Sequence, residues 1–312
     1  MYNLAALIAS DCGLPDLAHQ WCLDHADAYL RAPHQGAQVG RNILEPVVNL
    51  ARLRIRANDG ESAYELLTNL FQSVSDRADI NVDGLIIPAS VICDDDQHQA
   101  VRQWLWAILL SDGTRALTSA GRWAEAHQQL HAYNGVGALM LDGRQVAVIA
   151  HAQAGDRETA QQLIATTAPG DQPWLDAVTA CLAVLCQDGP TADLIADMVH
   201  CYERLSVRPD VAVFGVRLGL TVLDAAGGPH QAVASSHTTK LIGLTLEARD
   251  GYAIRDLLAH PYVAALLDTE HRAALDAISE ASSLDAKDIP AHLRDEIDAA
   301  LADSRTVLVR RR

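Results

Sequence analysis

Apolar residues recur at helical spacing through most of the chain. Residues 45–57 form one predicted helix with apolar residues around it, and residues 61–75 form a second with Leu66, Leu67 and Leu70 on one face. The same periodicity predicts further helices at 97–120, 123–133, 144–154, 156–166, 174–186, 192–205, 211–225, 251–260, 261–267, 270–282 and 291–303. The pattern therefore predicts an all-α fold.

A short motif links several of these helices: a helix-breaking residue is followed five positions later by an alanine. The pairs are Gly13 with Ala18, Asn58 with Ala63, Gly121 with Ala126, Gly155 with Ala160, and Gly227 with Ala232. Glycine and asparagine adopt a left-handed helix end at the lowest cost, and alanine lets two antiparallel helices approach closely. We therefore expect stacked helix pairs that form a solenoid.

The segments RANDGESAYELL, TSAGRWAEAHQQL and AQAGDRETAQQLI resemble the tetratricopeptide-repeat (TPR) family over residues 40–170. Gly121 and Gly155 stand 34 positions apart, which is the period of that repeat. The early aromatic residue and the closing proline of the family are mostly missing. The resemblance implies a divergent TPR-like member, or a related α-solenoid that shares the turn.

One interruption of the helical pattern has the form of a β-hairpin. Asp83-Gly84 lies between the apolar triplets of the segment 80–87, and this dipeptide suits a two-residue turn. The pattern predicts N-terminal helical repeats at 1–77, an insertion at 78–96, central TPR-like repeats at 97–170, less regular C-terminal repeats with a cap at 171–304, and a tail at 305–312. The hairpin either covers a helix pair or serves an interaction.

The net charge of −16 argues against nucleic acid as a partner, because phosphate binding needs a positive surface. The sequence contains no apolar run long enough to span a membrane and no secretory signal at its start. Its six cysteines are then interpreted as reduced thiols. Together with the shortage of lysine, these features predict a cytoplasmic bacterial protein.

The sequence supplies no familiar catalytic motif, and we expect no cofactor, metal or catalytic residue. The run Asp94-Asp95-Asp96 looks at first like the aspartate-rich metal site of a terpene synthase. It is better explained as a helix N-cap followed by acids at the positive end of a helix. An unusual enzyme on this scaffold stays open as an alternative.

The best candidates for binding are polar residues on the first helix of each pair, which would line the inner wall of a solenoid. Carboxylate-binding TPR domains use asparagine and cations there, so the resemblance singles out Asn49, Arg52 and Arg56. Arginine can also donate two parallel hydrogen bonds to one carboxylate in a bidentate arrangement. Helical spacing adds a further set of groove candidates: Arg102, Trp104, Trp106, Arg115, Arg144 and His151. Each of them also has a plain interpretation as a solvated arginine or a core tryptophan.

We therefore expect a protein- or peptide-binding helical-repeat module, an accessory or regulatory protein that acts through a partner. The alternative is a small-molecule sensor or catalyst on the same scaffold, with the hairpin as a lid. Leu4, Leu7 and Ile8 in the first helix have little preceding chain to cover them, so we also expect a homodimer or another protein contact at this end.

Overall fold

The computed structural model is all-α apart from one two-stranded sheet. It describes residues 1–32, 39–92, 95–205, 211–227 and 232–310, and these contain sixteen α-helices. The predicted N-cap at Asp94 and the predicted break at Pro209 lie outside the described residues. The predicted fold class is confirmed at this level.

The chain divides into two units, and each has its own apolar core. The first unit combines residues 1–130 with residues 285–312, and the second contains residues 131–284. Leu44, Leu67 and Leu105 belong to the core of the first unit. Met198 and Leu223 belong to the core of the second.

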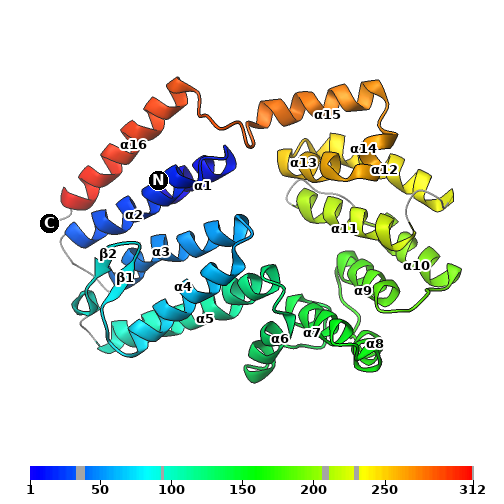
Figure 1. Ribbon diagram of the computed structural model, residues 1–312, viewed down its shortest axis with the longest axis horizontal. Helices are drawn as coiled ribbons and strands as arrows, with labels where there is room; N and C mark the ends of the chain where they lie inside the picture. The colour runs from blue at the N-terminus through cyan, green and yellow to red at the C-terminus, as the bar shows by residue number, and fades with distance from the viewer. Residues whose placement is uncertain (33–38, 93–94, 206–210, 228–231, 311–312) are drawn as a thin grey trace. The chain divides into compact units, whose positions relative to one another are not determined.

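Among the described residues, the first unit holds the two-stranded sheet and six helices that lie wholly within it, all labelled in Figure 1. Its elements are α1 (Tyr2–Asp11), α2 (Pro15–Arg31), α3 (Val39–Arg56), α4 (Gly60–Ser75), β1 (Ile80–Val82), β2 (Leu85–Ile87), α5 (Asp95–Ser119) and α16 (Ala291–Arg310). A short 3₁₀ turn (Ala89–Val91) links β2 to the segment before α5, and α6 (Trp123–Ala132) runs across the boundary between the units.

The second unit is built from helices alone in the described residues. They are α7 (Asp142–Gln153), α8 (Arg157–Ala165), α9 (Pro173–Leu185), α10 (Ala192–Glu203), α11 (Ala212–Ala225), α12 (Ala232–Ala248), α13 (Gly251–Ala259), α14 (Pro261–Leu266) and α15 (Thr269–Ser282).

The five predicted turns have the backbone that the motif requires. The φ angles at Gly13, Asn58, Gly121, Gly155 and Gly227 are 73°, 62°, 75°, 81° and 89°. The alanines that follow are fully buried at four of these sites, Ala18, Ala63, Ala126 and Ala160. The side chain of Ala232 lies outside the described residues. Sequence and structure therefore agree on how consecutive helices are joined.

The predicted hairpin is confirmed, with Ile80 opposite Ile87 and Val82 opposite Leu85. Asp83 and Gly84 both have positive φ, 50° and 89°, as a type I′ turn requires. The Asp83 carboxylate also lies 2.8 Å from His19 Nε2 of α2 and 3.0 Å from Arg54 Nη2 of α3. One residue thus forms the turn and attaches the hairpin to two helices.

The C-terminal helix α16 packs against α1 and α2, far from it in sequence (Figure 1). The backbone amide of Asp285 donates to the carbonyl of Asp11 at 2.8 Å, and Leu301 is buried in the core of the first unit. Residues 285–304, which we grouped with the C-terminal repeats, therefore belong to the first unit. The helix also continues through residues 305–310, which we expected to form a tail.

Candidate functional site

Four of the nine predicted binding residues line one cavity in the first unit. Asn49, Arg52 and Arg56 come from α3, and Arg115 comes from α5. The cavity has a volume of about 520 Å³, within the range of ligand pockets. Its remaining lining residues are Asn3, Leu4, Ala6, Leu7, Cys22, Glu45, Leu53, Ile55 and Asp112.

The α3 wall follows directly from helical spacing. Glu45, Asn49, Arg52 and Arg56 are separated by four, three and four positions, which places them along one stripe of the helix. On the other side of α3, buried residues such as Leu44 pack into the core. The amphipathic pattern of this helix therefore fixes which side chains reach the cavity.

The carboxylate of Asp112 in α5 lies next to two of the cavity arginines, Arg52 and Arg115. Its side chain is 8% exposed, and one of its carboxylate oxygens lies 2.8 Å from Arg52 Nε. The other oxygen lies 3.9 Å from Arg115 Nη1, so one buried carboxylate faces two guanidinium groups. Arg52 Nη1 also donates to Asn49 Oδ1 at 3.0 Å. This network holds Arg52 in a fixed orientation, as a charge-assisted hydrogen bond does.

Further contacts tie the rim of the cavity to α1 and α2. Arg56 forms an ion pair with Asp11. His25 Nδ1 lies 3.1 Å from Asn3 Oδ1, and the His25 ring stacks on Tyr2. Burial, and then the N-terminal amino group, lower the pKa of His25 to about 4, so its imidazole is neutral at neutral pH and donates to Asn3.

Cys22 lines the same cavity, but its chemistry is that of a core residue. The side chain is buried, and burial raises the pKa of its thiol to about 12. A thiol that stays protonated is a poor nucleophile and a poor metal ligand. The described residues also contain no group of three or more His, Cys, Asp or Glu that could hold a metal ion. Cys22 therefore contributes to the lining as a buried core side chain.

Asp112 is the site residue that sequence reasoning missed. It lies in the helical stretch ILLSDGTRAL, and an Asp-Gly pair is typical of a turn or of a solvent-exposed position. A signal was nevertheless present, because Asp112 shares its helix face with Leu105 and Ala116, both fully or nearly fully buried. A carboxylate on a buried face needs a cationic partner, and the structure supplies Arg52 from α3 and Arg115 from α5 itself.

The three other candidates on α5 do not line this cavity. Arg102 and Trp106 are exposed, and Trp104 is half-buried with the guanidinium of Arg41 at 5.3 Å from its ring centre. Trp104 and Arg115 do share a helix face, as their spacing predicts. They stand at opposite ends of that face, so only Arg115 reaches the cavity.

The two remaining candidates lie in the second unit and have structural partners. Arg144 is 7% exposed, and its guanidinium donates to the carbonyls of Gly137 and Leu163 and to two threonine hydroxyls. His151 Nδ1 lies 3.0 Å from Asp156 Oδ2, and Asp156 Oδ1 caps α8 by accepting a hydrogen bond from the backbone amide of Thr159. Arg144 and His151 are therefore held by the turns of their own helix pair.

Comparison with known proteins finds no match: no family model, no curated protein and no solved structure is similar to this chain. No helix in the described residues has the length and apolarity needed to cross a membrane.

Proposed function

We propose that the protein is a divergent TPR-like α-solenoid that binds a protein or peptide segment through the cavity of its first unit. The observation that carries this proposal is the convergence of Asn49, Arg52, Arg56 and Arg115 on one cavity. These residues were selected from sequence, and they come from two different helices. The turn geometry and buried alanines of the helix pairs support the repeat assignment.

The charge of the cavity favours an anionic partner. Its lining contains three arginines, Arg52, Arg56 and Arg115, against two carboxylates, Glu45 and Asp112. The protein as a whole carries a net charge of −16, so a lining with an excess positive charge is a local exception. A carboxylate of the partner would accept hydrogen bonds from Arg52 and Arg115, which Asp112 holds side by side.

The apolar wall of the cavity indicates what accompanies that carboxylate. Leu4 and Leu7 of α1 are 55% and 40% exposed, and both line the cavity. Leu53 and Ile55 add apolar surface from α3. A peptide segment with an apolar side chain next to an acidic group, or next to its own C-terminal carboxylate, matches both features.

The test is a peptide array in which each sequence is present with a free C-terminal carboxylate and as its amide. Acidic and free-carboxylate peptides with neighbouring apolar residues should bind, and Arg52→Met or Arg115→Met should weaken binding about tenfold. Arg102→Met is the matched control, because Arg102 is exposed on α5 outside the cavity. Peptides that bind equally to all three variants would overturn the proposal.

The exposed side chains of Leu4 and Leu7 also support the proposed protein contact at the N-terminal helix. Because α16 covers part of α1 and α2, this contact would use the α1 face that borders the cavity. Sedimentation of the wild type and of Leu7→Glu separates two forms of the proposal. A concentration-dependent dimer lost in Leu7→Glu means that a second copy is the partner, whereas a monomer in both leaves the surface to another protein.

A further inference from the structure

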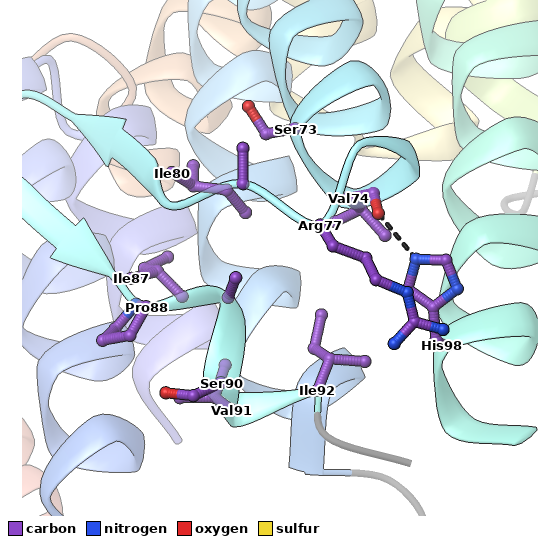
Figure 2. A pocket seen from close by; sticks show the side chains of 12 residues that line it. Ser73, Val74, Arg77, Ile80, Ile87, Pro88, Ser90, Val91, Ile92 and His98 are labelled. Atoms are coloured by element: carbon purple, nitrogen blue, oxygen red, sulfur yellow. Dashed lines mark hydrogen bonds between the residues drawn. The ribbon is translucent and has the colours of Figure 1, made fainter. Parts of the chain in front are cut away.

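A second cavity lies where the hairpin meets α4 and α5, and the proposed function does not use it. It has a volume of about 320 Å³ and is lined by residues from the end of α4, both strands, the 3₁₀ turn and α5. In Figure 2, Arg77 and His98 lie together on one side of this space, and Ile87 and Pro88 lie on the opposite side. All of these residues belong to the first unit.

The walls of this cavity are fixed by interactions away from its surface. The tip of the hairpin is attached to α2 and α3 through Asp83. At its base, the Asp79 carboxylate accepts a hydrogen bond of 2.8 Å from the backbone amide of Ala89. On the helical side, His98 Nε2 donates to the carbonyl of Val74 at 2.7 Å, as drawn in Figure 2. A preformed cavity loses little entropy when a ligand enters.

The lining is apolar with one charged exception. Val74, Ile80, Ile87 and Ile92 are buried, and they supply the body of the surface. Arg77 is the one arginine among the described lining residues, which include no lysine, aspartate or glutamate. This combination of an apolar interior and one cation at the side is typical of sites for small amphipathic anions.

The existing partner of Arg77 can be exchanged. Arg77 forms an ion pair with Asp95, whose side chain is 89% exposed, whereas the Arg77 side chain is 50% exposed. Exposed ion pairs contribute little free energy, because water solvates both partners nearly as well. A ligand carboxylate that leaves its apolar body in the cavity could therefore replace Asp95 at small cost.

We propose that this cavity binds a small monocarboxylic acid with an apolar chain or ring. The apolar body would pack on Val74, Ile80 and Ile87, and the carboxylate would pair with Arg77. The volume of about 320 Å³ suits a small metabolite more than a folded partner's side-chain cluster. This proposal rests on different residues from the peptide-binding cavity and stands or falls without it.

The test uses octanoate and its uncharged analogue 1-octanol as probes, measured by calorimetry and by ligand-observed NMR with the full chain. Octanoate should bind at submillimolar to millimolar concentration and more tightly than octanol. Arg77→Gln should weaken octanoate about twofold to fivefold and leave octanol binding unchanged. This exposed substitution leaves the core intact, so a loss of binding does not report unfolding.

A second variant tests the location. Ala78→Trp places a large ring at an exposed alanine of the lining and should reduce binding of both probes, whereas Ala107→Trp, at an exposed position of α5 outside the lining, should not. The proposal is overturned if neither probe binds at millimolar concentration. It is also overturned if Arg77→Gln leaves the octanoate preference intact, or if Ala78→Trp binds as the wild type does.

Discussion

Arginine on the first helix of a pair serves opposite purposes in the two units. In the first unit, the side chain of Arg52 is 40% exposed and reaches a cavity. In the second unit, Arg144 is 7% exposed, and its hydrogen bonds join the ends of α7 and α8 to the preceding loop. The same residue type at the same kind of position thus lines a cavity in one unit and belongs to the interior in the other.

The difference comes from the loop before α7. A Cβ on Gly143 would lie 2.0 Å from the carbonyl oxygen of Gly135, so these two segments approach more closely than any side chain allows. This approach brings the Gly137 carbonyl to 2.8 Å from Arg144 Nη1. Helical spacing can place an arginine on a face, but it does not show whether a loop will cover that face.

The sharpest test of this contrast is Arg144→Met. The substitution keeps an apolar stem but removes five hydrogen bonds of the buried guanidinium, including those to the carbonyls of Gly137 and Leu163, and we expect a loss of about 3–5 kcal/mol in the stability of the second unit. Arg52→Met in the first unit should cost less, about 1–2 kcal/mol, because Arg52 is itself 40% exposed and Arg115 still faces the buried Asp112 carboxylate.

Urea denaturation combined with amide hydrogen exchange would report the stability of each unit separately. If Arg144→Met and Arg52→Met destabilise their units equally, the distinction between an interior and a binding arginine is wrong.

Glycines provide a second comparison. A Cβ on Gly60, at the start of α4, would lie 2.2 Å from the backbone carbonyl of Ala116 in α5. In the second unit, a Cβ on Gly219 would lie 2.4 Å from the hydroxyl of Tyr202, which is the end of a buried side chain and not backbone. We expect Gly60→Ala to destabilise the first unit by about 2–4 kcal/mol, and Gly219→Ala to cost less, because backbone cannot yield as a side chain does.

Thermal denaturation of the two variants checks this order. Gly121→Ala is a useful reference, because a Cβ there meets no atom within 4 Å and only the positive φ of 75° opposes it. Its cost should be about 1 kcal/mol. A Gly60→Ala variant no less stable than Gly121→Ala would mean that α4 and α5 can separate freely.

The sequence predicted the turns between consecutive elements well, but it did not predict that the C-terminal helix packs against the first two helices. Turns such as those at Gly121 and Asp83-Gly84 depend on backbone conformations that few residues adopt, so the residue types reveal them. The return of α16 to α1 and α2 depends on contacts between segments far apart in sequence, such as Leu301 with the first core. Helix periodicity records which face of α16 is apolar, but not which helix covers it.

The same division applies to the candidate site. The stripe of Asn49, Arg52 and Arg56 follows from the periodicity of one helix, so the sequence was sufficient to find it. The pairing of Asp112 with Arg52 joins α5 to α3 across 60 positions, and nothing in either helix alone specifies it. Cavity residues contributed by α1, such as Leu7, depend likewise on tertiary packing.

The pH dependence of stability should be governed by one histidine in each unit whose pKa is lowered by burial. His25 lies between Tyr2 and Tyr29 in the first unit, with its pKa lowered to about 4 by burial and the N-terminal amino group. Burial also lowers the pKa of His237 in the second unit. Each unfolded histidine titrates near 6.5, so the folded units bind fewer protons between that value and the lowered pKa.

The contribution of these histidines to stability is therefore complete above pH 6.5 and declines as the pH falls toward 4. For His25 we expect a loss of about 2 kcal/mol, which is less than the full pKa shift implies because the ring is partly exposed. His25→Gln should flatten the dependence of the first unit and leave that of the second unit unchanged. Hydrogen exchange at a series of pH values measures both units in one sample. A first unit that gains stability as the pH falls through this range would contradict the assignment.

The smallest expected effect concerns Asp83, which has a conformational role and an electrostatic role at one position. Hydrogen bonding with His19, and then the nearby charge of Arg54, lower the pKa of its carboxyl, so the stabilisation is present above its ordinary range and is lost as the carboxyl is protonated at low pH.

Asp83→Asn keeps a residue that tolerates positive φ but removes the charge, and should cost about 0.5–1 kcal/mol at neutral pH. Asp83→Ala removes both features and should cost about 1 kcal/mol more, because alanine opposes a φ of 50°. The difference between the two variants, measured by urea denaturation of the first unit, separates the turn from the attachment to α2 and α3. Equal costs would mean that the ion pairs alone hold the hairpin, and the wall of the smaller cavity would then depend on charge and not on the turn.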